Sequence, residues 1–157
     1  MKIVNFDVCR HPQRFYQRYE YVFLSLIWSG LKFLDGFHCS LESGRKYLTL
    51  SFPGESVDFE FGQDRENWVA IFDSPNFVRD PESGQACWLQ DGHRVMFPAT
   101  VELTTEQASV WRDEFTRLRE IYRNPTPANL LRVEWGVTGM LRFMLDQKGD
   151  TPSRSPV

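Results

Sequence analysis

The chain has 157 residues, about the length of one domain, so its size disfavours a two-domain enzyme. Apolar residues make up 41% and aromatic residues 15% of the sequence, which excludes a disordered or low-complexity protein. The net charge of −3 and the lack of a basic run disfavour direct binding of nucleic acid by this chain. The sequence shows neither a bilayer-spanning apolar stretch nor signal-peptide features, so we expect a cytoplasmic protein that does not bind membranes.

Residues 1–20 carry only a weak strand pattern, and we interpret them as an N-terminal arm. Arg10, Arg14 and Arg18 lie in this segment between isolated apolar residues. On a mobile arm these arginines are solvated charges. Alternatively, the arm folds over a binding site, and Arg14 or Arg18 supplies planar donors to the oxygen atoms of a ligand.

Residues 21–100 have the pattern of short antiparallel strands. Runs rich in aromatic and branched residues predict these strands, and turn signals separate them at Ser29-Gly30, Asp35-Gly36, Ser43-Gly44, Pro53-Gly54 and Gly62-Gln63-Asp64. The weaker apolar groups 86–89 and 94–97 predict a last hairpin that closes the sheet. This spacing is typical of a sandwich or a barrel.

The pattern changes to a helical period in residues 104–147. Thr104 and Gln107 match a capping box, and the apolar residues that follow recur every three or four positions up to Tyr122. Thr126 and Pro127 predict the start of a second helix. The short link between the two helices predicts an antiparallel hairpin. The segment 148–157 has the composition of a linker.

The second helix has a broad apolar face. We expect this face both to cap the barrel and to pair with a second copy of the chain in a homodimer. Its residues are Leu130, Val133, Val137, Leu141 and Met144.

No group of residues in the sequence predicts catalysis or a cofactor. The histidines His11, His38 and His93 lie on unrelated segments, and only His38 has a carboxylate at ligand spacing, on Glu42. There is no nucleophile elbow and no phosphate-binding loop. The three cysteines form no metal-binding motif, and we interpret them as structural thiols. We therefore expect neither an enzyme nor a bound metal.

The aromatic residues predict a binding cup. Alternation along residues 57–61 places Val57 and Phe59 on one face, and Glu66 and Trp68 share a face of the next predicted strand. A Phe and a Trp from neighbouring strands, with Glu66 at the rim, form the apolar surface with one polar group that small-molecule sites show. Sugars bind such surfaces through their C–H faces. The alternative is that these rings are ordinary core.

Several segments, taken together in their order and spacing, resemble the N-terminal effector-binding domain of AraC-family transcriptional regulators. In the strand region these segments are Trp28–Gly36, Leu41–Gly44, Leu48–Gly54, Phe59–Gly62 and Asp64–Asp73. In the helical region they are Glu102–Gln107 and Asn124–Leu130.

The resemblance implies a cupin-like jelly-roll β-barrel that binds a small effector, often a sugar, followed by helices through which such regulators dimerise. It also implies a C-terminal DNA-binding domain, to which nothing in this chain corresponds. The positions that match the family's pocket are Val57, Phe59, Glu66 and Trp68, with Arg14 or Arg18 as the arm arginine. Val57 departs from the polar residue of some members, which disfavours an arabinose-like pocket.

Two other functions stay open at this point. One is a cupin-type metalloenzyme, such as an isomerase or a dioxygenase, with His38 as a metal ligand. The other is a dimerisation module without a ligand, whose cup is filled by its own aromatic side chains.

Overall fold

The computed structural model of the chain describes residues 1–36 and 38–147. The fold is mainly β with two helices, as predicted, and its sheets are antiparallel and open. The elements in chain order are β1 (Lys2–Cys9), β2 (Gln13–Arg18), β3 (Val22–Gly36), β4 (Cys39–Glu42), β5 (Lys46–Ser51), β6 (Ser56–Asp73), β7 (Phe77–Arg79), β8 (Ala86–Gln90), β9 (His93–Phe97), β10 (Thr100–Leu103), α1 (Thr105–Tyr122) and α2 (Pro127–Asp146). The predicted linker, 148–157, lies outside the described residues.

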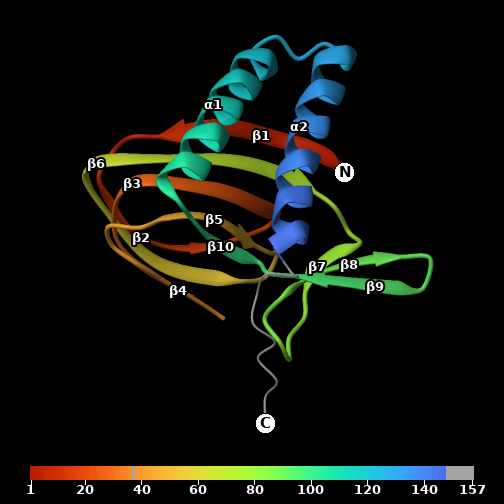
Figure 1. The fold of residues 1–157 in the computed structure, drawn as a ribbon, viewed down its shortest axis with the longest axis horizontal. Helices are drawn as coiled ribbons and strands as arrows, with labels where there is room; N and C mark the ends of the chain where they lie inside the picture. The colour runs from red at the N-terminus through yellow and green to blue at the C-terminus, as the bar shows by residue number, and fades with distance from the viewer. Residues whose placement is uncertain (37, 148–157) are drawn as a thin grey trace.

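Two long strands, β3 and β6, pair with each other at the centre of the main sheet. Each also pairs with two short strands. Strands β1 and β2 follow one another along β6, and β5 and β4 follow one another along β3. Strand β10 extends the sheet beyond β5. The two long strands therefore determine the shape of the whole sheet (Figure 1).

Two predicted turns lie inside the long strands instead of ending them. Ser29-Gly30 is an irregularity of β3, with shifts of register on both sides, and residues 62–64 belong to β6. Gly30 has a φ of +83°, and a Cβ added to it would lie 2.6 Å from the Arg65 backbone. Glycine suits this position because it adopts a positive φ without strain and because it has no Cβ to clash with the Arg65 backbone. The turn predicted at Ser29-Gly30 is therefore a bulge within β3. A glycine in a strand sequence is compatible with either a turn or a bulge.

The predicted N-terminal arm is wrong. Residues 2–9 and 13–18 are strands β1 and β2, and both pair with β6 along their length. Phe6 of β1 is buried, and its ring lies 5.3 Å from the ring of Phe115 in α1. Polar residues dominate this segment because β1 and β2 lie at a sheet edge, where one face and one side are open to solvent.

The hairpin predicted from residues 86–89 and 94–97 is confirmed as β8 and β9. It does not close the main sheet, however. With β7 it forms a separate three-stranded sheet that extends away from the main sheet (Figure 1). The main sheet therefore stays open, with β1 and β2 along one edge and β10 and β4 along the other, where the sequence predicted a closed barrel.

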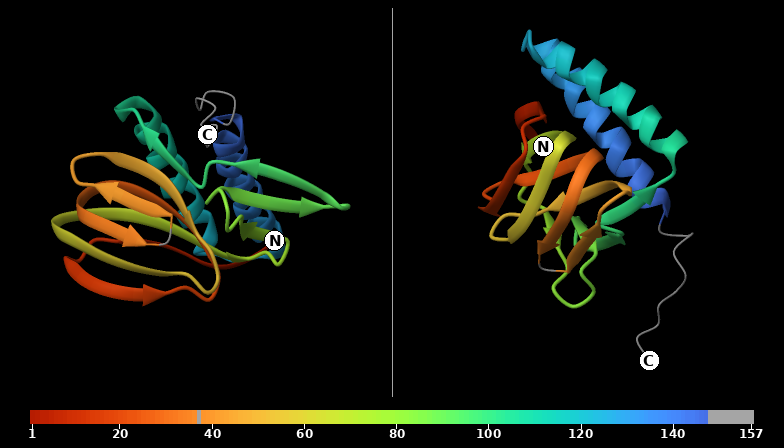
Figure 2. Two further views of the ribbon diagram at one scale, coloured as in Figure 1. Left: turned by 90° about the horizontal axis from the view of Figure 1, so that it is seen from below. Right: turned by 90° about the vertical axis from the view of Figure 1, so that its left-hand side faces the viewer.

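Both helices begin as predicted. Thr104 and Gln107 form the capping box of α1, and Thr126 caps α2 with Pro127 in its first turn. The helices lie side by side, run in opposite directions and cover one face of the main sheet (Figures 1 and 2). Among residues 1–36 and 38–147, no helix is long and apolar enough to cross a membrane.

The apolar stripe of α2 belongs to the core of its own chain. Val133, Val137, Leu141 and Met144 are buried in the core that α2 shares with α1 and the main sheet, and Leu130 is only half-buried. These residues were predicted to pair with a second copy as well. That part of the prediction is wrong, because four of the five side chains are already buried within their own chain.

Candidate functional site

Strand alternation gives the main sheet two different faces. In β3, Val22, Leu24 and Leu26 join the core beneath the helices. Phe23 and Ile27 lie on the other face, and neither α1 nor α2 covers that face (Figure 2). On this uncovered face the curled sheet buries a second, smaller apolar cluster that includes Ile27, Phe59 and Phe61. Phe15 and Phe23 keep more exposed surface there, so this face can offer apolar surface to a ligand.

A cavity of about 350 Å³ lies against the uncovered face, and we call it the cup. Residues from both halves of β3 and β6 line it, so the sheet curls around it. Its aromatic wall is Phe15, Phe59 and Phe61, and its polar lining includes Asn5, Asp7, Cys9, Gln13, Gln17, Ser25, Arg65 and Asn67. This volume and this mixture of side chains are typical of a site for a small organic molecule.

The most deeply placed charge in the cup is Arg65, which is 8% exposed. Its Nε donates to Oδ1 of Asn67 over 2.7 Å. Its Nη1 donates to the carbonyl oxygen of His11 over 3.0 Å and to Oε1 of Gln13 over 3.1 Å. Its guanidinium carbon lies 4.3 Å from the centre of the Phe61 ring. All four partners are uncharged, so the cup contains a buried positive charge held by neutral groups.

Two weakly acidic groups of the cup are held in their neutral forms. Burial raises the pKa of the Cys9 thiol, and Arg65 opposes this shift while Asp7 adds to it. Burial also raises the pKa of Tyr19 to about 12. Neither group is an activated nucleophile, because a reactive cysteine needs a lowered pKa. The lining therefore suits binding better than covalent chemistry.

Only one of the predicted pocket residues lines the cup. Phe59 contributes to its aromatic wall, and Val57 is buried next to it without lining the cavity. Trp68 lies on the opposite face, in the core beneath α1, where its Nε1 donates to Oε2 of Glu66. Glu66 is bound by both Nε and Nη2 of Arg112, over 2.6 and 2.8 Å. Glu66 and Trp68 therefore hold α1 on the sheet.

The continuity of β6 explains this difference. Because the strand runs without a turn from Ser56 to Asp73, its odd-numbered residues share one face over its whole length. Phe59, Arg65 and Asn67 are odd and line the cup, and Trp68 is even. The sequence reasoning missed Arg65 and Asn67 because it placed a turn at 62–64. Alternation continued from Phe59 through that segment would have found both.

The two predicted arm arginines point away from the cup. Nη2 of Arg14 lies 3.5 Å from Oδ2 of Asp58, and its guanidinium lies over the Phe33 ring. Arg18 is exposed at the end of β2 and does not line the cavity. The arginine that the fold places in the cup is Arg65, whereas Arg14 and Arg18 lie outside it.

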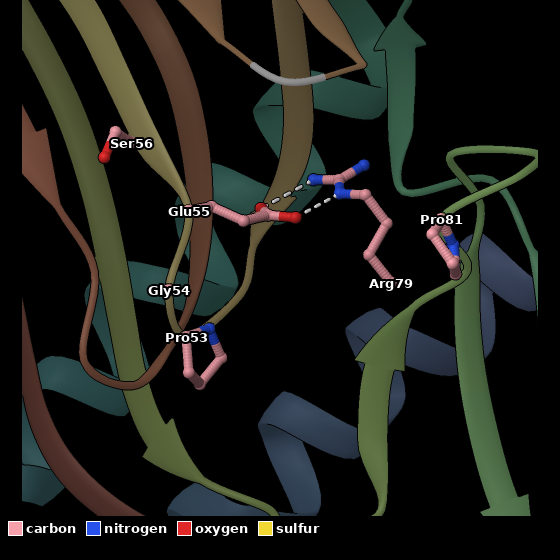
Figure 3. Close-up of a pocket in the computed structure, with 6 residues that line it drawn as sticks. All are labelled: Pro53, Gly54, Glu55, Ser56, Arg79 and Pro81. Carbon is pink, nitrogen blue, oxygen red and sulfur yellow. Dashed lines mark hydrogen bonds and ion pairs between the residues drawn. The ribbon is translucent and has the colours of Figure 1, made fainter.

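A second hollow, of about 440 Å³, lies between the β5–β6 turn and β7 (Figure 3). Its charges are Glu55 and Arg79, whose side chains are 13% and 6% exposed. Arg79 binds both carboxylate oxygens of Glu55 and also donates to the carbonyl oxygens of Leu50 and Gly84. These charges satisfy each other, so the pair anchors β7 and leaves no buried charge for a ligand.

A groove of about 390 Å³ lies on the outer side of the two helices, lined by residues that include Trp111, Trp135 and Gly139. Trp135 is 66% exposed, and Leu131 of the same helix is also exposed. This outer surface, and not the buried stripe, is the part of α2 that is open to a partner.

The geometry gives no metal centre in the described part of the chain. No three His, Cys, Asp or Glu side chains gather there in a way that could hold an ion. His38 lies away from the cup, and its Nε2 is 3.1 Å from the carbonyl oxygen of Pro81. Comparison with protein-family models, curated proteins and solved structures finds no match to this chain.

Proposed function

We propose that this chain is the effector-binding and dimerisation domain of an AraC-type transcriptional regulator, and that its receptor site is the cup. The observation that carries the proposal is the 350 Å³ cavity, which combines an aromatic wall with buried polar groups on the face of the sheet opposite α1 and α2 (Figure 2). The resemblance of the strand and helix segments supports the regulatory role. An open antiparallel sheet that curls around a cavity is compatible with both the receptor site and the regulatory role.

The cup also distinguishes this proposal from a ligand-free dimerisation module. That alternative requires the aromatic side chains to fill the interior of the sheet, and they leave room for a small molecule. A sugar or a compound of similar size fits this volume, with the phenylalanine rings against its C–H surface and the amides of Gln13, Gln17 and Asn67 near its hydroxyl groups.

Two neighbouring residues of β2 provide a matched test. Phe15 lines the cup, and Tyr16 points to the other side of the strand and is 68% exposed. We expect a thermal-shift screen of pentoses, hexoses and their derivatives to find a compound that raises the Tm of the wild type and of Tyr16→Ala. Phe15→Ala will lose at least part of this response. Equal responses of both variants would place the ligand elsewhere.

A cavity-filling variant gives an independent test of the same site. Ser25 lies on the cup side of the central strand β3, away from the core beneath the helices. Ser25→Phe should occupy the cavity and abolish binding while the helices stay in place. Retention of wild-type affinity by a folded Ser25→Phe protein would exclude the cup as the receptor site.

The proposed homodimer uses the outer surface of α2 in place of the buried stripe. Leu131 and Trp135 lie one turn apart there, and large exposed aromatic side chains are typical of interface centres. Sedimentation of the wild type should show a dimer that Trp135→Glu converts to a monomer. Thr138→Glu, an exposed position on the same helix, tests whether any added charge has this effect. An unchanged dimer in Trp135→Glu would place the interface elsewhere.

The regulatory role has a test that does not depend on the cup. An AraC-type regulator carries two helix-turn-helix units after its effector-binding domain. We expect the reading frame that encodes this chain to contain such units downstream of residue 157. A catalytic domain in that position would contradict the regulatory role and leave the binding site itself unaffected.

A further inference from the structure

Two arginines of the described residues have little exposed surface, and they differ in their partners. The side chain of Arg79 is 6% exposed and forms a two-point ion pair with Glu55. Arg65 is 8% exposed as a whole residue, but within residues 1–36 and 38–147 it forms no ion pair with any carboxylate. Removing a charge from water is costly unless an opposite charge compensates it. Arg65 therefore lacks the compensation that the same fold gives to Arg79.

One nitrogen of Arg65 is still available. Nε and Nη1 donate to Asn67, His11 and Gln13, whereas Nη2 has no hydrogen-bond partner in the described part of the chain. No buried side-chain nitrogen or oxygen of the described residues lacks a partner, so Nη2 keeps some accessible surface, and Arg65 is among the residues that line the cup. The three existing hydrogen bonds and the Phe61 ring fix the guanidinium in place, so little entropy is lost when Nη2 binds a ligand.

The neighbouring acids are already paired with other cations. Asp7 also lines the cup, but its Oδ1 accepts from the backbone of Val8 and lies 3.3 Å from Nε of Arg119 in α1. Glu66, next to Arg65 in sequence, lies on the helix side and binds Arg112. No acid of the described chain therefore neutralises Arg65.

We propose that the ligand of the cup carries a carboxylate, which Nη2 of Arg65 binds, on a hydroxylated body that the aromatic wall holds. This inference rests on the proposed function. A single guanidinium compensates one negative charge, which favours a monoanion over a phosphate dianion. The amides and the Ser25 hydroxyl suit hydroxyl groups. The chemical class is thus that of sugar acids.

Four compounds on one carbon frame test the choice of group. These are glucose, glucuronate, gluconate and glucose 6-phosphate, titrated calorimetrically at constant ionic strength. We expect glucuronate or gluconate to bind at least tenfold more tightly than glucose, because hydrogen bonds to ionised groups are stronger. Tighter binding of glucose 6-phosphate than of either acid would overturn the choice of a carboxylate. Lack of binding by both acids would overturn the inference as a whole.

Variants of Arg65 test the residue. Arg65→Met should lower the affinity for the sugar acid at least tenfold, and by a larger factor than it lowers any affinity for glucose. Arg65→Lys keeps the positive charge and is the substitute test if Arg65→Met does not fold. It should also weaken binding of the acid, because lysine lacks the fixed planar donors of arginine. Arg14→Met removes an arginine on the outer surface and should bind like the wild type.

The outcomes separate the two proposals. If glucose binds as tightly as glucuronate, or if both Arg65 variants bind the acid like the wild type, the inference about the ligand class fails while the cup remains a receptor. If the Phe15→Ala and Ser25→Phe variants show that no compound binds in the cup, the proposed function fails as well.

Discussion

Two glycines of α2 allow the packing of the helices to be tested with a matched pair of substitutions. A Cβ added to Gly136 would lie 2.5 Å from both Cδ atoms of Leu118 in α1. A Cβ added to Gly139, three residues further along the same helix, would meet no atom within 4 Å. Both lie within α2, so alanine raises the helix propensity equally at the two positions.

The structure gives the size of the effect. Each Gly→Ala change gains about 1 kcal/mol from helix propensity. At Gly136 the new methyl group lies about 1 Å inside the normal carbon–carbon distance. Because Leu118 is fully buried, it cannot move away freely, and overpacking of this kind costs about 1–3 kcal/mol. Gly139→Ala should therefore be stabilised by about 1 kcal/mol, and Gly136→Ala should be about 1–3 kcal/mol less stable than Gly139→Ala.

The assay is thermal and urea unfolding of the two variants and the wild type. A change of 1 kcal/mol shifts Tm by about 2–4 °C in a domain of this size, so the two variants should differ by at least about 2 °C. Measurements at two protein concentrations, about tenfold apart, reveal any contribution from self-association, which makes Tm depend on concentration. Gly139 needs this control because it lines the outer groove.

Equal Tm changes in the two variants would refute the proposed close approach of the helices, and so would a Gly136→Ala protein that is the more stable of the two. A second variant tests the cause directly. In a Leu118→Ala background the clashing methyl groups are absent, so Gly136→Ala should then stabilise the protein like Gly139→Ala. Persistence of the penalty in that background would assign it to another neighbour.

Three further predictions concern the charged and titratable groups. Glu66→Gln should lower stability at neutral pH by about 1 kcal/mol. Burial alone would raise the pKa of Glu66, but hydrogen bonds from Arg112 and Trp68 lower it overall from 4.5, so its stabilising effect is full above pH 4.5. It is lost as the pH falls through the lower, folded-state pKa, and unfolding curves of the two proteins should converge there. Arg79→Met should cost about 3–5 kcal/mol in urea unfolding, since it leaves Glu55 buried and unpaired, and a loss below about 1 kcal/mol would contradict a buried ion pair. Cys9 should react with iodoacetamide more slowly than free cysteine at pH 8, because burial raises its thiol pKa, and mass spectrometry of the labelled peptide measures the rate.

The local signals in the sequence located the helices accurately. Thr104, Gln107, Thr126 and Pro127 fix the two helix starts through hydrogen bonds and steric effects between near neighbours in the chain. Such interactions do not depend on the rest of the fold, so sequence reasoning finds them. The role of the apolar stripe of α2 could not be predicted from the sequence in the same way. Its pattern shows that Val133 and Val137 are buried, but not whether their own sheet or a second copy buries them.

The glycines of the strand region show the opposite case. Gly30 and Gly62 read equally well as turns and as irregularities inside long strands, because glycine permits both conformations. A turn predicted at 62–64 placed Phe59 and Arg65 on different strands. It also led to Phe59 being grouped with Trp68, which lies on the other face of the sheet. A single misplaced break thus changed the membership of the site.

The amino-acid sequence by itself determined the class of fold, the helix boundaries and the positions of most strands, since each depends on residues a few positions apart. Only the tertiary structure decided that residues 2–9 and 13–18 belong to the sheet, that β3 and β6 run on through their glycines, and that Arg65 is buried in the cup with no carboxylate partner among the described residues. These features depend on which distant strands pair and which face a second layer covers, and the free energy of that choice comes from contacts between residues far apart in the chain.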